Sequence, residues 1–336
     1  MQKEVSFFLP DFYSGVFLYH GLRSLYEDRP EMFRESFKIG AVYGCFPGMI
    51  WNGGNTITKG SIVNYDLAVQ FISLYEKMGI PMRFTFTNPL ITEEHLNDQY
   101  CNLITSLAHN GKNEILVVSP VLEKYLREKY PNYKYIRSIL QTENSCFDTE
   151  NKYEMSVMQR QKNNDWEYLQ SVPEEKRGKI EFLCDENCID NCPRGYSHYN
   201  DLAYFQLYYG HSRIPGDVNC SFKEDGIDMC KKMQNGEGNN RNYISPQDIV
   251  DKYLPLGYCN FKLAGRYNII WMIEESVRYL IKEEYQQDVR IFIWQRYIQN
   301  LDFLQFLYKP FVNLPLNFFP REDTTSVFDE LFKSNS

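Results

Sequence analysis

The feature that most constrains this chain of 336 residues is a repeated alternation of short apolar runs with helical segments. The runs are continuously apolar, which is typical of strands buried on both faces of a parallel sheet. Most of them are followed by a segment whose apolar residues recur at helical spacing. The predicted strands are residues 5–9, 38–43, 82–87, 114–118, 134–139, 153–158, 179–183 and 260–263.

Eight such units predict an α/β fold, a (β/α)8 TIM-like barrel. A doubly wound open sheet is the alternative, but no G-x-G-x-x-G follows the first predicted strand. We expect the barrel to cover residues 1–286, with an insertion at 200–242 between the seventh and eighth strands. Residues 287–336 are expected to form a helical, aromatic C-terminal extension and a tail.

Composition limits the environment and the partners of the protein. The net charge of −8 argues against a general affinity for nucleic-acid backbones. No apolar run approaches the roughly 18 residues of a membrane helix, and the N-terminus lacks the apolar core of a signal peptide. We therefore expect a cytoplasmic protein without a membrane span, whose nine cysteines are not paired as disulfides.

A cysteine-rich segment follows the seventh predicted strand directly. From Cys184 to Tyr199 it reads C-D-E-N-C-I-D-N-C-P-R-G-Y-S-H-Y. Thiolates suit zinc and iron–sulfur clusters, but structural zinc sites usually use C-x2-C pairs, whereas iron–sulfur sites use more varied spacings. The C-x3-C-x3-C spacing, which also differs from the radical-SAM pattern, favours an iron–sulfur cluster, with zinc as the alternative. We expect the cluster to contain four irons.

The predicted metal ligands are Cys188, Cys192 and Cys220, the last of which comes from the insertion. The fourth ligand is one of Cys184, Cys230 and Cys45. Cys184 is alternatively the last core residue of its strand, since a free cysteine behaves as a small buried hydrophobe. The competing interpretation of the segment is a loop with three cysteines and no metal.

Polar residues follow several of the other predicted strands. In a barrel the loops after the strands share one face, where active sites lie. We predict substrate contacts from four residues in these loops: Asn52, Asn88, Ser119 and Arg266. Asparagine is also common at turns for conformational reasons, and a salt bridge to Asp185 or Glu186 is the alternative role of Arg266.

Two further side chains in the cysteine-rich segment are candidate catalysts. Glu186 and His198 have the chemistry of a general acid or base, and either could activate a metal-bound water. His198 is alternatively a metal ligand or a buried side chain with a hydrogen bond.

Three stretches together resemble the collagenase-like peptidases of unknown catalytic type and their relatives. They are E-N-C-I-D-N-C-P-R-G-Y-S-H-Y, F-K-L-A-G-R at the last strand, and K-I-G-A-V-Y-G at the second. The resemblance extends over residues 1–285 and implies a barrel that holds an iron–sulfur cluster through four cysteines. Some relatives act in oxygen-independent hydroxylation of ubiquinone precursors or RNA bases, and others were described as peptidases. This chain lacks the R-G-x-C opening of the family's cysteine motif.

These observations lead to one preferred function and two alternatives. The preferred function is an enzyme that hydroxylates or otherwise modifies a small-molecule or carried substrate without oxygen. A metal-dependent or peptidase-like hydrolase is the first alternative, although no G-x-S-x-G nucleophile motif is present. The second is a non-catalytic, cluster-bearing protein whose aromatic C-terminal segment binds a protein partner or a second copy of the chain.

Overall fold

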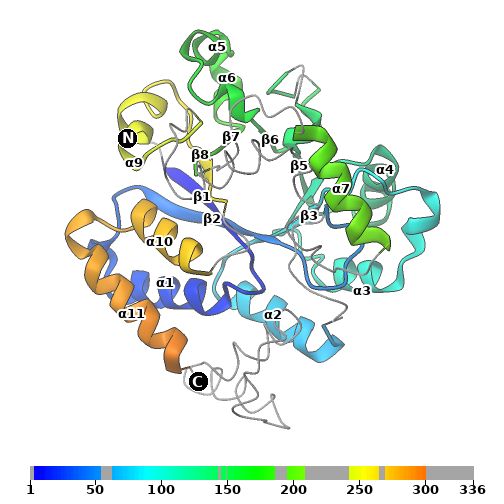
Figure 1. The fold of residues 1–336 in the computed structure, drawn as a ribbon, viewed down its shortest axis with the longest axis horizontal. Coiled ribbons are helices and arrows are strands. Elements are labelled where there is room, and N and C mark those ends of the chain that lie inside the picture. Colours follow the sequence, from blue (N-terminus) through cyan, green and yellow to red (C-terminus); the bar gives the residue numbers. More distant parts are fainter. Residues whose placement is uncertain are drawn as a thin grey trace, which may run out of the picture.

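The computed structural model describes residues 4–53, 63–142, 145–148, 150–185, 195–208, 242–264 and 269–299. Its centre is a closed parallel barrel whose strands follow one another in chain order from β1 to β8 (Figure 1). The predicted (β/α)8 barrel is therefore confirmed. The strands are β1 (Val5–Pro10), β2 (Phe37–Gly44), β3 (Met82–Phe86), β4 (Glu114–Val117), β5 (Lys134–Arg137), β6 (Met155–Val157), β7 (Ile180–Leu183) and β8 (Asn260–Lys262).

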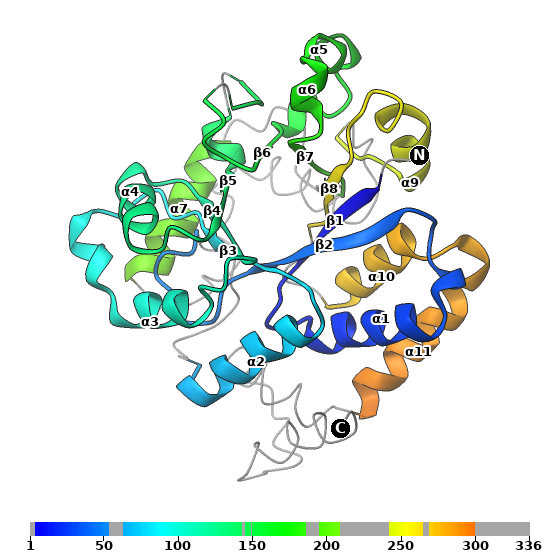
Figure 2. The ribbon, with the colours of Figure 1, turned by 180° about the vertical axis from the view of Figure 1, so that it is seen from behind.

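Helices surround the barrel in a ring that is visible from both sides (Figures 1 and 2). The α-helices of the described residues are α1 (Val16–Asp28), α2 (Tyr65–Lys77), α3 (Gln99–Leu107), α4 (Pro120–Lys129), α5 (Trp166–Ser171), α6 (Glu174–Arg177), α7 (Gly195–Tyr208), α9 (Pro246–Asp248), α10 (Ile269–Leu280) and α11 (Gln286–Gln299). Short 3-10 helices occupy Pro30–Met32, Glu93–Asn97, Ile139–Gln141, Arg160–Lys162 and Glu283–Tyr285, and a π-helix at Ile249–Tyr253 extends α9.

Alternation along each strand divides its side chains between the helix layer and the lumen of the barrel. Outward-facing aromatic residues such as Phe84, Phe182 and Phe261 belong to the main core beneath the helices. A smaller apolar group, made of Leu116, Ile136, Val157 and Leu183, packs apart from that core, on the lumen side of β4 to β7. The strands are thus buried on both faces, as their continuous apolar composition predicts.

Capping side chains set several helix boundaries. Asn64 accepts a hydrogen bond from the Leu67 amide (2.8 Å), which begins α2 where the sequence predicts it. The sequence predicts one helix from Thr92 to about His109, closed by Asn110-Gly111. The structure has two elements there instead. Thr92 and His95 form a capping box on the 3-10 helix, and Asp98 then caps α3 through the Cys101 amide. The second cap explains why the single helix breaks.

The connection between β7 and β8 departs from the regular βα pattern. The helix that covers these two strands is α9 with its π-helical continuation, because Tyr253 packs edge-on against Phe182 and Phe261. Helix α7, although it comes first after β7, lies beside β3 and α4 in both views (Figures 1 and 2). It therefore covers loops that follow β2 and β3 rather than its own strand.

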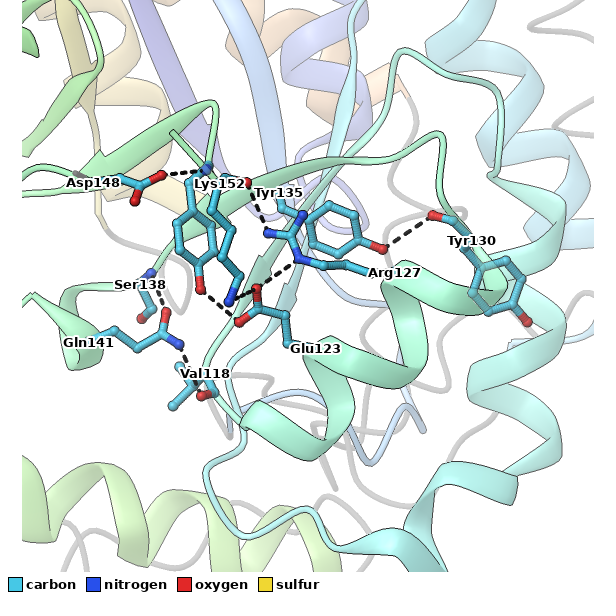
Figure 3. Close-up of polar contacts among 10 residues, drawn as sticks. Val118, Glu123, Arg127, Tyr130, Tyr135, Ser138, Gln141, Asp148 and Lys152 are labelled. Carbon is cyan, nitrogen blue, oxygen red and sulfur yellow. Dashed lines mark hydrogen bonds and ion pairs between the residues drawn. The ribbon is translucent and has the colours of Figure 1, made fainter. Parts of the chain in front are cut away.

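A polar cluster fastens the segment before β6 to α4 (Figure 3). The buried Glu123 carboxylate accepts bonds from Arg127 (2.8 Å), Lys152 (2.9 Å) and the Tyr153 hydroxyl (2.7 Å). Arg127 also donates to the Lys152 carbonyl (3.1 Å) and lies over the Tyr135 ring. No α-helix follows β5 among the described residues, and this cluster helps to hold the loop that takes its place.

The part of the C-terminal extension that the structure describes is α11, which packs against α1 and α10. Residues 300–336, and most of the predicted insertion at 200–242, lie outside the described residues. Within the described ranges, no helix has both the length and the apolar composition needed to cross a bilayer.

Candidate functional site

The barrel brings the carboxyl ends of its strands to one face, and three of the predicted site residues are described at this face. Asn52, Asn88 and Ser119 follow β2, β3 and β4. His198 lies in the first turn of α7, but its side chain is outside the described residues. Also outside them lie Glu186, Cys188, Cys192, Cys220, Cys230 and Arg266.

Asn88 joins three segments of this face. Its Nδ2 donates to the Ile50 carbonyl (3.1 Å) and to the Ala203 carbonyl of α7 (3.2 Å). Its Oδ1 accepts from the Leu90 amide (2.9 Å), and its own amide donates to the Trp51 carbonyl (3.2 Å). The side chain is fully buried. Both donors of the amide are thus used by backbone carbonyls, and a substrate-binding role for Asn88 stays a prediction.

Asn52 lies next to a short polar chain at the ends of β2 and β3. The Thr85 hydroxyl donates to Asn52 Oδ1 (3.4 Å), and the Cys45 sulfur lies 3.6 Å from the same hydroxyl. Thr85 alternates with Phe84 and Phe86, so it faces the lumen. Cys45, one of the candidate fourth ligands, is therefore beside a lumen-facing group, although it is 2% exposed.

Ser119 caps α4 rather than opening onto a cavity. Its hydroxyl accepts from the Leu122 amide (3.3 Å) and donates to the Ile91 carbonyl (3.1 Å). The substrate-binding roles of Ser119 and Asn52 remain predictions.

Cys184 has the surroundings of a core residue. Its side chain is fully buried in the main apolar core, and its sulfur lies 3.9 Å from the Phe182 carbonyl. Burial, together with the adjacent Asp185 carboxylate, raises the pKa of the Cys184 thiol well above its usual value. Across the described ranges, no group of three histidine, cysteine or acidic side chains gathers as a metal site.

The carboxylate of Asp185 fixes the end of β7. It accepts hydrogen bonds from the Ala264 amide after β8 and from the Trp271 indole of α10 (3.1 Å). One turn further along α10, Glu275 is 2% exposed and pairs with Arg278 at 3.4 Å. Burial, and secondarily the charge of Asp185, raises the pKa of Glu275 to about 7. The chain enters the cysteine-rich segment directly from this rigid point.

A charged network lies inside the lumen, and the sequence interpretation missed it. Arg83 of β3 is fully buried, donates to Glu114 of β4 at 2.5 Å and also pairs with Glu181 of β7. Its guanidinium lies over the Phe8 ring at 3.8 Å. Lys262 of β8 lies 4.0 Å from Glu181 and over the Tyr43 ring. The signal in the sequence is that charged residues interrupt otherwise apolar strands, but this signal does not identify their partners.

The comparisons with known proteins are sparse. No protein-family model matches the chain, and no curated protein matches it. One solved structure, described as the U32 peptidase Mk0906, shares 12% sequence identity with a TM-score of 0.42. The match covers 78% of this chain and 93% of that structure. At this level the likeness carries no argument about chemistry.

Proposed function

We propose that this protein is a barrel enzyme that holds an iron–sulfur cluster at the carboxyl face and modifies a small or carried substrate without oxygen, by hydroxylation or a related reaction. The observation that carries the proposal is the position of the cysteine-rich segment. β7 ends at Leu183, and the segment with Cys188 and Cys192 follows at the face where barrels place their chemistry.

The ligand set in this proposal is Cys188, Cys192 and Cys220, with Cys45, Cys184 or Cys230 as the fourth. The two candidates within the described residues, Cys45 and Cys184, both belong to the main apolar core. Cys45 in addition lies 3.6 Å from the hydroxyl of the lumen-facing Thr85. When bound, an iron–sulfur cluster supplies one-electron chemistry.

The chain's own residues have distinct parts in this proposal. Asp185 holds the start of the cysteine-rich segment against β8 and α10. Beneath this face the lumen contains the buried apolar side chains of β4 to β7 and the Arg83 network, so in this proposal the substrate enters from the carboxyl face. Glu186 and His198 are the proposed groups for proton transfer, and Arg266 the proposed partner of a substrate anion.

The test is anaerobic purification of the full chain, with assays of iron, sulfide and visible absorption. We expect a brown protein whose cluster is lost in the Cys188→Ala/Cys192→Ala variant. Cys259→Ala is the matched control, because Cys259 lies before β8 at the opposite end of the barrel, and this variant should keep the cluster.

The other outcomes discriminate between functions. Stoichiometric zinc in a colourless protein would favour the metal-dependent or peptidase-like hydrolase. A protein without any metal under these conditions would refute the proposed cofactor.

A further inference from the structure

Helix α7 rests on a rigid platform made of the loops after β2 and β3, residues 45–53 and 87–91. Trp51 is fully buried in this platform and donates through its indole to the His95 carbonyl (2.9 Å). Its ring packs edge-on against Phe86 at 5.4 Å. Gly53 passes so close to Thr87 that a Cβ at this position would overlap the threonine. The two loops are therefore interlocked and give α7 a defined seat.

Two side chains attach α7 to this platform. Asn88 donates from the platform to the Ala203 carbonyl (3.2 Å), and Gln206 donates from the helix to the Met49 carbonyl (3.2 Å). Ala203 is fully buried and Gln206 is 3% exposed, so both bonds are shielded from water. On the other side of the helix Tyr204 is 45% exposed. The two bonds thus fix one face of α7. In one of them the platform donates to the helix, and in the other the helix donates to the platform.

The position of α7 matters because the helix follows the cysteine-rich segment directly in the chain. The helix begins at Gly195, three residues after Cys192, and His198 lies in its first turn. Asn88 follows β3, on a different part of the barrel from β7, where the cysteine-rich segment starts. The bond from Asn88 to Ala203 therefore joins the β3 side of the face to α7, the helix that includes the last residues of the cysteine-rich segment.

We propose that Asn88 is a positioning residue that holds α7, the helix that has His198 in its first turn, over the carboxyl face. The inference rests on the proposed function for its consequence at the cluster, but the bond to α7 is independent of it. Gln206 is the second anchor in the same role. The sequence predicts Asn88 as a substrate contact. In this proposal its buried amide acts instead through α7.

The experiment compares Asn88→Asp with the wild-type full chain, purified anaerobically. Aspartate keeps the oxygen that accepts from Leu90 but removes both donors, so the bond to α7 is lost together with the bond to the Ile50 carbonyl. We expect amide exchange in peptides covering residues 195–208 to become about fivefold to tenfold faster, as a local opening does when buried hydrogen bonds are lost. Iron should also be lost to a chelator several-fold faster than from the wild type.

Two further variants make the result interpretable. Ser245→Ala removes the cap of α9, whose hydrogen bonds lie within residues 245–248 and not on the platform, so exchange at 195–208 should stay at the wild-type rate. Gln206→Ala removes the other anchor without altering the platform, and it should reproduce the faster exchange if the Asn88 variant fails to fold.

The outcomes separate the two proposals. Unchanged exchange at 195–208 in both anchor variants would overturn the positioning role. Faster exchange together with an unchanged rate of iron release would overturn the link between α7 and the cluster. A wild-type chain without iron would refute the proposed cofactor, while the exchange data would still decide whether Asn88 holds the helix.

Discussion

Glu275 shows how one buried carboxyl group makes stability depend on pH. Its pKa of about 7 is caused first by burial and then by the nearby Asp185, while Arg278 acts in the opposite direction. The folded protein therefore binds the proton more tightly than the unfolded chain does. This contribution to stability is complete below the unfolded pKa and is lost as the pH rises through 7.

We predict that Glu275→Gln raises the free energy of unfolding at pH 8 by up to about 3 kcal/mol, since an amide avoids the cost of a buried charge. The gain should vanish near pH 4. Chemical denaturation across this range measures it. Asp288→Asn, at an exposed position of α11, is the control and should keep the wild-type pH dependence. An equal gain at both pH values would contradict the assignment.

At the scale of elements, Glu123 is a buried carboxylate with hydrogen-bond partners, and its pKa shifts in the opposite direction to that of Glu275. Burial alone would raise the pKa of Glu123, but hydrogen bonds from Lys152, Tyr153 and Arg127 outweigh it and lower the pKa. The stability that this cluster gives to the join between α4 and β6 is therefore present above the unfolded pKa and is lost as the pH falls.

We predict that Glu123→Gln lowers the free energy of unfolding by about 1–3 kcal/mol at pH 7, because buried donors lose a charged acceptor. Hydrogen exchange should increase in residues 150–157, which the cluster fastens to α4. Glu128→Gln, at an exposed position of the same helix, should change neither quantity. If exchange in 150–157 stayed at the wild-type rate, the cluster would not be what holds this segment.

Elements are also the scale at which the sequence predicts most. The continuous apolar composition of the strands follows from burial on both faces, so each strand was found within a few residues of its place. The break at Asp98 was missed because a second cap competes with a continuous helix. The seat of α7 was out of reach, because Asn88 and Ala203 are 115 positions apart and only the closed barrel brings them together.

The candidate site also has some features that the local sequence predicts and others that depend on distant residues. The cysteine-rich segment was placed at a strand end because parallel strands direct their carboxyl ends to one face. The roles of Asn88 and Ser119 depend on which backbone groups lie opposite them, and that information is not local. Arg83 and Glu181 were overlooked because a charge in a short strand says nothing of its partner across the lumen.

At the scale of the whole molecule, the lumen network links strands on opposite sides of the barrel. Arg83 of β3 pairs with Glu114 of the neighbouring β4 and with Glu181 of β7. Lys262 of β8, the neighbour of β7, also lies near Glu181. The two cations balance the two carboxylates, and all four side chains are buried. The presence of a buried charge network is weak evidence that the network as a whole stabilises the protein. Removing one member, however, leaves a buried charge without its partner.

We predict that Glu181→Gln lowers the free energy of unfolding by about 3–5 kcal/mol, because the Arg83 guanidinium and the Lys262 ammonium lose the carboxylate between them. Arg83→Met should cost a similar amount, since it removes the guanidinium that pairs with both Glu114 and Glu181. The double variant should cost less than the sum of the two, because each single change already breaks the same interaction. Denaturation midpoints and slopes of all three, beside the exposed control Glu175→Gln, measure the coupling. Strict additivity would show that Arg83 and Glu181 stabilise the barrel independently, and that no charge network ties β3 to β7.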